Sequence, residues 1–386
     1  MTPAEHDIVL FGATGFTGGL TAEYLAAHAP VGTRIALAGR NPAKLEAVRA
    51  RAEKLSDVPL LHADVEDPAS LRAVAESARL VISTVGPFIL YGEPLVAACA
   101  AAGTDYVDIT GEPEFVDLMW LRYHEQAQRN GARLVHCCGF DSIPHDLGAF
   151  FTVQQLPEDV PIDISGFVRA HGAISGGTYH SAINGFARAR HAARYALKRR
   201  RLEARPADRR VRGIAGRPHH DAEAGGWVMP LPTIDPQIVL RSARALPRYG
   251  PDFSYGHYLV QKRLATLAAL AGGVGAAVVL AQLAPTRRLL LSLKSSGDGP
   301  TPEERENAWF RVRFIGEGGG ERVITEVSGG DLGYGETAKM VGESALCLVH
   351  DELPETSGQV TTAAAMGQPL VERLQRAGIA FREVSR

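Results

Sequence analysis

The chain has 386 residues, enough for two or more domains, and its 45 % hydrophobic and 22 % charged residues are ordinary for a soluble globular protein. Its formal net charge of −2 gives no reason to expect a nucleic-acid partner. Its four cysteines form no CxxC pair, which argues against a zinc or thioredoxin-type site, and no basic-then-apolar leader is found, so we expect a cytoplasmic, metal-free protein.

The first 145 residues alternate short apolar runs with helical patterns. The runs predict strands at 7–11, 34–38, 58–62, 80–84, 106–109 and 133–138. Such alternation is typical of a parallel sheet that is covered by helices on both faces. We therefore predict an α/β fold in which residues 1–145 form a doubly wound, Rossmann-type parallel sheet.

A glycine-punctuated turn follows the first predicted strand and opens a helical pattern. Glycine at Gly12 lets the chain turn sharply, at Gly15 lets the backbone approach a pyrophosphate, and at Gly18 lets the helix pack closely. The helix N-terminus would offer its free N–H groups to the phosphates. The alternative is a tight turn without a ligand. The residues predicted to bind a dinucleotide here are Gly12, Ala13, Thr14, Gly15, Phe16, Thr17 and Gly18.

The end of the second predicted strand favours NADP(H) over NAD(H). Arg40 stands where an NAD site usually carries an acidic residue, and Lys44 follows one turn later. A guanidinium can grip a 2′-phosphate with two hydrogen bonds, whereas a carboxylate would repel it. Asp64 could accept from the adenine amino group or cap the next helix. The turn after the fourth strand could line the nicotinamide ribose through Ser83, Thr84, Val85, Gly86 and Pro87.

Residues 146–333 show a different pattern, which predicts a second, mixed α/β domain. A strand at 162–172 is followed by a long basic helix, and 188–217 carry twelve Lys or Arg against two acidic residues. This basic stretch is either a solvated helix face with a loop, or a docking surface for an acidic partner such as lipid head groups. Alternating apolar and arginine residues around Val312 predict an antiparallel hairpin that turns at the glycines 318–320.

Residues 264–284 form a charge-free run of 21 residues between two basic pairs. Its length permits a membrane span, but its Ala- and Gly-rich composition is only weakly hydrophobic. A buried helix and a membrane-surface helix are the stronger alternatives. Further along, residues 334–351 and 367–378 predict helices, and residues 379–384 predict a last strand.

Several segments resemble one known family. "GATGFTGGL", "AGRNPAKL", "VGPFILYGEPLVAACAAAGTDYVDITGE" and "CGFDSIPHDLG" are similar to the saccharopine dehydrogenase-like oxidoreductases, and most of all to their actinobacterial trans-acting enoyl reductase branch. The resemblance implies NADP(H) use, an inserted second domain over 146–333, and a C-terminal segment over 334–386 that returns to the Rossmann domain. It also implies a role in lipid biosynthesis, with an acyl chain on a carrier protein or a lipid-like substrate as the partner.

Reduction of an enoyl thioester needs a donor for the enolate oxygen and a proton source for the α-carbon. Asp141, Ser142 and His145 follow the last Rossmann strand, where cofactor and substrate should meet, and are candidates for these roles. Tyr91 could reach the same cleft. Each has a structural alternative: a cap for the following turn, a packed histidine, or an ordinary tyrosine. Two weaker matches are Tyr179 with His180 at a helix start, and Tyr258 with Lys262, whose short-chain-dehydrogenase spacing we attribute to chance.

The sequence therefore predicts an NADP(H)-dependent oxidoreductase that reduces an unsaturated acyl chain. A saccharopine-type dehydrogenase acting on a C–N bond is one alternative, although its substrate would need cationic groups in the cleft. A non-catalytic NADP-binding scaffold at a membrane or lipid surface is another. A homodimer and a peripheral position at the inner face of the plasma membrane are compatible with these features.

Overall fold

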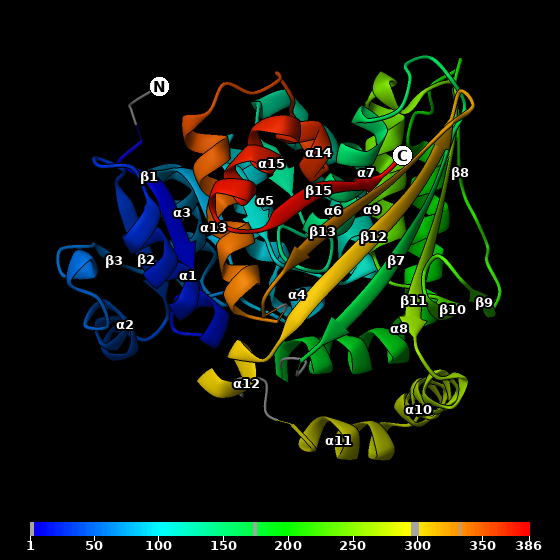
Figure 1. Ribbon diagram of the computed structural model, residues 1–386. Coiled ribbons are helices and arrows are strands. Elements are labelled where there is room, and N and C mark those ends of the chain that lie inside the picture. Colours follow the sequence, from blue (N-terminus) through cyan, green and yellow to red (C-terminus); the bar gives the residue numbers. More distant parts are fainter. Residues whose placement is uncertain (1–3, 173–175, 295–300, 332) are drawn as a thin grey trace.

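The computed structural model describes residues 4–172, 176–294, 301–331 and 333–386, and two β-sheets organise the chain (Figure 1). The first sheet is parallel throughout, in the order β3-β2-β1-β4-β5-β6-β14, and six of its strands alternate with helices. This is the strand order of a Rossmann domain with one strand added at its edge. The strands are β1 (His6–Phe11), β2 (Ile35–Gly39), β3 (Leu60–His62), β4 (Ala78–Ser83), β5 (Asp105–Asp108), β6 (Arg133–Val135) and β14 (Gly358–Val360).

Apolar residues on both faces of these strands build the core of the first sheet. Ile8 and Leu10 of β1 belong to one buried cluster, and Val9 and Phe11 belong to the cluster on the opposite face. Near-continuous apolar strands of this kind are expected where helices cover both faces. The covering and connecting helices are α1 (Phe16–His28), α2 (Pro42–Arg49), η1 (Glu53–Leu55), α3 (Pro68–Ser77), α4 (Phe88–Tyr91), α5 (Glu93–Ala102) and α6 (Pro113–Asn130).

The six predicted strands of this sheet are confirmed, and two of them are clearly shorter than predicted. The third is only three residues long, from Leu60 to His62. The sixth ends at Val135 instead of residue 138, because Cys137 adopts a left-handed φ of 65° that a strand cannot continue. The added strand β14 was not predicted, since three residues carry no readable pattern.

The second sheet is mixed, in the order β15-β13-β12-β7-β11-β10-β9, with β8 paired to β11. Neighbouring strands are antiparallel except for β11 with β7 and β11 with β8. The predicted hairpin is confirmed: Phe310 and Val312 are buried, while Arg311 is exposed. The strands are β7 (Ile162–His171), β8 (Arg210–Gly213), β9 (His219–Asp221), β10 (Gly226–Pro230), β11 (Asp252–Gln261), β12 (Trp309–Gly318), β13 (Glu321–Gly329) and β15 (Ala380–Ser385).

Two sets of helices join the sheets. α7 (Ile143–Gln154) leaves the first sheet and packs on β12, β13 and α9 (Asp235–Ala245), which η2 (Pro247–Tyr249) follows. The C-terminal residues contribute to both sheets, because α13 (Gly335–His350) packs on α1 and β4, whereas β15 pairs with β13. α14 (Thr362–Ala365) and α15 (Gly367–Arg376) pack on α7 between these elements.

The basic helix α8 (Gly176–Leu202) is only partly a solvated face. Arg188 forms an ion pair with Glu114 of α6 at 2.7 Å, and Arg199 is 2 % exposed and pairs with Asp117 and Glu203. The interpretation of this stretch as a fully solvated face is therefore wrong for these two arginines. The ion pairs of both arginines join α8 to α6, and the buried guanidinium of Arg199 requires its paired carboxylates.

The apolar run forms α10 (Leu264–Ala281), followed by α11 (Ala284–Ser292) and, near the next strand, α12 (Pro302–Glu306). Of the residues in α10 only Leu267 and Ala281 are buried, so the prediction of a buried helix is wrong. By length and composition α10 is the one helix among the described residues that could cross a membrane. Figure 1 shows α10 and α11 below α8, and α10 also contacts the edge of the second sheet at β10 and β11.

Candidate active site

The turn after β1 has the backbone shape that a phosphate-binding loop requires. Gly12 has a φ of 91°, which favours glycine, and a Cβ there would lie 2.7 Å from both Thr84 Oγ1 and Val85 Cγ2. Thr84 Oγ1 donates hydrogen bonds to the carbonyl oxygens of Phe11 and Gly12 at 3.3 and 3.1 Å. The loop is therefore attached to the end of β4, at the point where the strand order of the sheet reverses.

The helix α1 begins immediately after this loop with uncapped N–H groups. Gly15 is its N-cap residue, and no side chain caps the helix. The first N–H groups of a helix have no intrahelical partner, so here they remain available to an anion. The hydroxyls of Thr14 and Thr17 have no hydrogen-bond partner among the described residues and can add donors. Ala13 is buried, and the Phe16 ring contacts Tyr334 edge-on at 4.5 Å.

We predict that Gly18→Ala destabilises the loop and weakens NADPH binding. A Cβ on Gly18 would lie 2.1 Å from the Gly12 carbonyl oxygen, a backbone atom that cannot move aside. We expect a loss of about 2 kcal/mol in the free energy of unfolding, typical of overpacking, together with weaker NADPH binding by calorimetry. Gly19→Ala is the matched control, since its Cβ would meet only the flexible end of Arg51. Equal stability of the two variants would contradict the close packing.

Arg40 follows β2 directly and Lys44 lies in the first turn of α2, as the sequence predicted, and both are exposed. Neither side chain makes an ion pair or hydrogen bond within the part of the chain that the structure describes. Lys44 instead donates its backbone N–H to the Asn41 side chain, which caps α2. An unpaired guanidinium and ammonium at this strand end leave two positive charges available to a 2′-phosphate.

Asp64 follows β3 and does not cap the next helix. Its Oδ1 accepts from the N–H of Glu66 at 3.1 Å, while Asp67 is the N-cap residue of α3 and accepts from Ala69. The capping alternative for Asp64 is therefore wrong. Its half-buried carboxylate turns the chain at the end of β3, and contact with adenine stays a prediction.

The turn after β4 exposes some of its predicted ligand-binding residues and buries others. Thr84 and Val85 are half-buried and Gly86 is exposed, whereas Ser83 and Pro87 are buried. A ligand at this edge would meet the first three and could not reach the Ser83 hydroxyl. Tyr91 ends the short helix α4, is 43 % exposed, and makes no hydrogen bond with any described residue.

Glu112, which was not singled out in the sequence, fixes this turn. Its carboxylate accepts from the backbone N–H groups of Phe88 and Ile89, both at 2.9 Å, and from the hydroxyl of Ser181 on α8 at 2.6 Å. Burial raises the pKa of Glu112, and these three donors oppose that rise. One buried carboxylate thus joins the nucleotide-binding sheet to α8.

Asp141 follows β6 and lies with the other loops at the carboxyl edge of the first sheet, the edge at which its parallel strands end. A Cβ on Gly111, after β5, would lie 2.9 Å from the Asp141 carboxyl carbon. Asp141 is half-buried, and its carboxyl group accepts no hydrogen bond from the described residues. Burial, with the nearby charges of Asp235 and Glu112, raises the pKa of Asp141 to about 7. It can therefore carry a proton near neutral pH.

His145 belongs to a buried network beneath Asp141. Its Nδ1 lies 3.2 Å from Asp235 Oδ1 on α9, and His257 Nε2 on β11 lies 3.4 Å from Asp235 Oδ2. Burial lowers the pKa of His145 to about 4, although Asp235 opposes this, so His145 is neutral at pH 7. Burial would raise the pKa of Asp235, but the two histidines lower it. Ser142 occupies the N-cap position of α7, yet its hydroxyl points to Asp235 at 3.5 Å and caps nothing.

His145, Asp235 and His257 are also the one group of described residues whose ligand atoms lie close enough together for a metal ion. Both carboxylate oxygens of Asp235 already have partners, since Thr233 donates to one and Ser142 to the other. Both carboxylate oxygens of Asp235 therefore accept a hydrogen bond from the protein itself. The network also places the carboxylate of Asp235 close enough to Asp141 to raise the pKa of Asp141, in addition to the effects of burial and of Glu112.

The weaker candidates from the sequence have structural roles. Tyr179 Oη donates to the Leu290 carbonyl at 3.0 Å, and His180 Nε2 lies 2.6 Å from the Lys294 carbonyl, so both hold α11 against α8. Tyr258 is buried in the strand β11 and stacks on Phe167, so it does not share a helix with Lys262. Cys137 and Cys138 are buried, and burial raises the pKa of both thiols, as expected of inert residues.

Sequence reasoning missed Asp235, His257 and the pair of Asp108 with His136. Asp108 Oδ2 lies 2.6 Å from His136 Nδ1, and its other oxygen accepts from the Cys137 N–H at 3.1 Å, which shapes the chain ahead of Asp141. Asp235 and His257 lie 90 and 112 residues beyond His145, and only the fold brings them together. A surface depression of about 600 Å³ lies elsewhere, at the amino edge of the first sheet, where Arg79 and Arg133 are already paired with Asp7 and Asp105.

Comparison with known proteins agrees with this geometry. Residues 8–135 match the family model described as the saccharopine dehydrogenase NADP-binding domain. The chain is 39 % identical to a Mycobacterium tuberculosis protein provisionally named trans-acting enoyl reductase, with 98 % of each chain covered. It is 37 % identical to the trans-acting enoyl reductase of Mycobacterium ulcerans, with 97 % of each covered. Saccharopine dehydrogenase (L-Glu forming) of Saccharomyces cerevisiae shares the fold at a TM-score of 0.56 and 14 % identity, covering 98 % of this chain and all of that one.

Proposed function

The chain belongs to the saccharopine dehydrogenase-like oxidoreductases, in the trans-acting enoyl reductase branch, and on this premise we propose that it is an NADPH-dependent enoyl reductase for carrier-bound acyl chains. The observation that carries the proposal is the 37–39 % identity, over nearly the whole chain, to proteins named for that activity. The arrangement at the carboxyl edge of the first sheet supports it.

The residues present fit a dinucleotide with a 2′-phosphate. The Gly12 turn and the uncapped start of α1 offer backbone N–H groups for a pyrophosphate. Arg40 after β2 and Lys44 in the first turn of α2 offer positive charge one strand away. Bound NADPH would supply the hydride.

The protein must then supply the proton, and Asp141 is suited to do so. Adding hydride to the β-carbon of an enoyl thioester places a negative charge on the thioester oxygen as an enolate. Transfer of one proton to the α-carbon then completes the saturated chain. Asp141 lies at the carboxyl edge of the first sheet, where the cofactor is expected to bind. Its side chain is partly accessible, and it can hold a proton near pH 7. Burial raises the pKa of Asp141 most, and the negative charge of the nearby Asp235 raises it further, so Asp235 acts on the reaction only through Asp141.

A saccharopine-type reaction fits these residues less well. Its substrate carries several carboxylates and would need cationic groups beside the nicotinamide. The charged groups that act on Asp141 are instead the acidic Asp235 and Glu112. Arg188 and Arg199 of α8 are already paired with Glu114 and Asp117 of α6. The local charge therefore favours an uncharged reacting group.

A panel assay tests the proposal. Purified protein with NADPH is offered enoyl thioesters on coenzyme A, enoyl thioesters on a carrier protein, and imino acids, while absorbance at the nicotinamide band is followed. We expect oxidation of NADPH with the enoyl thioesters alone, fastest on the carrier. Oxidation with imino acids alone would favour a saccharopine-type enzyme, and tight NADPH binding without any turnover would favour a scaffold.

A further inference from the structure

Residues 264–294, which include α10 and α11, present an unusually apolar surface. We call this segment the apolar platform. Sixteen of the eighteen residues of α10 are not buried. The most exposed large apolar side chains of the platform are Val279 at 68 %, Leu283 at 63 %, Leu289 at 64 % and Leu293 at 69 %. Large apolar side chains exposed in such number along two consecutive helices indicate a binding site for a partner or a membrane.

The charges of the platform select the partner. From Lys262 to Lys294 the sequence contains five cations and no Asp or Glu. Lys262, Arg263 and Arg288 are exposed and form no ion pair with any described residue. A second copy of the same face would bring like charges together, whereas an anionic lipid surface would neutralise them. We propose that the apolar platform seats this protein on the surface of an anionic membrane.

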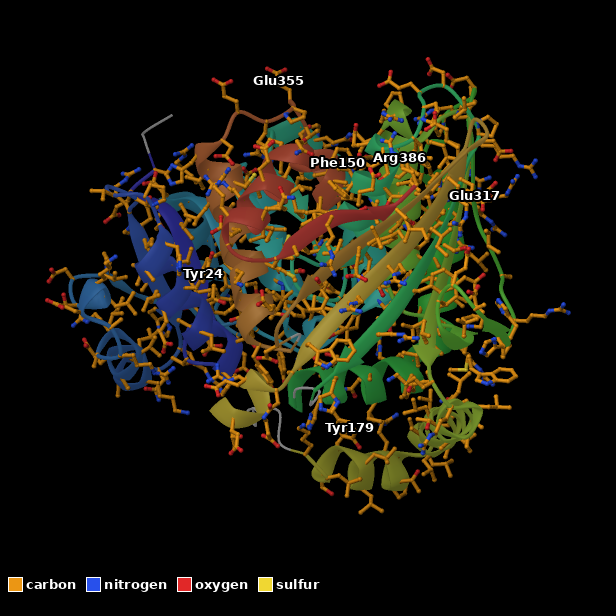
Figure 2. The ribbon with its side chains drawn as sticks, viewed as in Figure 1. Tyr24, Phe150, Tyr179, Glu317, Glu355 and Arg386 are labelled. Carbon is orange, nitrogen blue, oxygen red and sulfur yellow. The ribbon has the colours of Figure 1, made fainter. Side chains whose placement is uncertain are left out.

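Contacts with the body of the protein indicate that the platform lies on the membrane instead of crossing it. Gln282 Nε2 donates to the Phe186 carbonyl of α8 at 2.9 Å, and Tyr179 of α8 donates to the Leu290 carbonyl of α11 at 3.0 Å. Figure 2 shows Tyr179 between these two helices. A span by α10 would break these contacts. With α8 on one side, the exposed apolar residues can enter the interface as those of a monotopic helix do.

The platform also connects to the candidate active site through α8. Ser181, on the same helix as Tyr179, donates to the Glu112 carboxylate that fixes the turn after β4. Figure 1 places α10, α11 and α12 on one side of the molecule, and α12 contacts the phosphate loop through Arg305 over the Phe16 ring. A membrane bound by the platform therefore lies on the side of the molecule that carries the carboxyl edge of the first sheet. Supply of an acyl chain from that membrane rests on the proposed function, but membrane seating does not.

Vesicle sedimentation tests the seating without substrate or NADPH, so its outcome is independent of the enoyl reductase assay. The full chain is mixed with vesicles of phosphatidylcholine, or of phosphatidylcholine with phosphatidylglycerol. We expect binding to the anionic vesicles, weakened by salt. Val279→Glu with Leu289→Glu should lower the partition coefficient by more than about ten-fold, because charges enter lipid poorly. Val31→Glu, at a fully exposed valine outside the platform, is the matched control and should bind normally.

The cations are tested separately. Replacing Lys262, Arg263 and Arg288 by Gln should weaken binding to anionic vesicles by about five-fold for each charge removed. Thermal denaturation should show unchanged stability, since all three side chains are exposed. Vesicle binding by the double Glu variant equal to that of the parent would overturn the proposal. If the parent did not bind vesicles but formed a dimer that the double Glu variant dissociated, the platform would be an interface with a second copy of the chain. If the vesicle-bound parent resisted extraction by high salt and by carbonate, α10 would span the membrane instead of lying on its surface.

Discussion

Asp141→Asn is expected to lower kcat for enoyl reduction by about 10²- to 10⁴-fold, the range over which a general acid contributes. Asparagine has the same shape but has no proton to give at the pH of the assay. KM should change little, because Asp141 is assigned to proton delivery and not to binding. Steady-state rates with saturating NADPH provide the measurement, and Asp208→Asn, at an exposed carboxylate far along the chain, provides the control.

The pH profile of the unmodified enzyme should carry the same signature. With a pKa of about 7, Asp141 is protonated below neutral pH and ionised above it. Activity that requires the protonated form should therefore fall as pH rises above about 7. The residual activity of Asp141→Asn should lack this descending limb. A profile that stays flat to pH 9 in the parent, or a variant with half the parent's kcat, would remove Asp141 from the reaction.

The same substitution should raise stability while it removes activity. The folded-state pKa of Asp141, about 7, lies above its ordinary value of 3.8, so the folded state binds the proton more tightly than the unfolded state. Ionisation of Asp141 therefore lowers the free energy of unfolding. This loss of stability is absent below about pH 4, grows as pH rises from 4 to 7, and is complete above pH 7. Asparagine removes it, by up to about 4 kcal/mol at pH 8. Urea denaturation should show the gain at pH 8 and a smaller one at pH 5.5.

Local sequence could predict the nucleotide-binding half because its signals are local. The glycine spacing from Gly12 to Gly18, the apolar strand before it and Arg40 after the next strand are all read within a few residues of one another. The structure places them as a loop, a helix start and an exposed strand end. Each feature depends on backbone geometry that neighbouring residues dictate, so a single sequence is sufficient to find it.

The buried network of His145, Asp235 and His257 could not be predicted in the same way. Asp235 stands at the start of an ordinary helix, and His257 stands in a strand without a distinguishing pattern. They meet His145 only because β11 pairs in parallel with β7 and α9 packs on α7. Such long-range pairing has no sequence signal at either residue. The high pKa of Asp141 therefore became visible only with the fold.

The apolar run at 264–284 illustrates a different limit. Alanine, glycine and leucine read alike whether a helix is buried, lies on a membrane or crosses one, since periodicity cannot tell these apart when a helix is apolar all round. Exposure decides between them. Only Leu267 and Ala281 are buried, which removes the first alternative, and the contacts with α8 favour the second.

Arg40→Asp is expected to reverse the preference for NADPH over NADH. A guanidinium that grips a 2′-phosphate through two charge-assisted hydrogen bonds contributes about 1.5–3 kcal/mol per bond, and a carboxylate in its place repels the phosphate and can accept from the ribose hydroxyls instead. Affinity for NADPH should fall by at least about 100-fold, while affinity for NADH stays constant or rises. Arg40 is exposed and unpaired among the described residues, so the fold should be unaffected.

Titration calorimetry with each nucleotide measures this reversal without any knowledge of the substrate. Arg40→Lys should give an intermediate loss for NADPH, because a point charge remains but the planar fork does not. Lys44→Glu should cost less than Arg40→Asp, since Lys44 lies one turn further along α2. Arg376→Asp, an equal charge reversal at an exposed residue of α15, should leave both affinities unchanged. If Arg40→Asp kept the NADPH preference, the 2′-phosphate would have to be bound by another group, and the assignment of the β2 end as its site would be wrong.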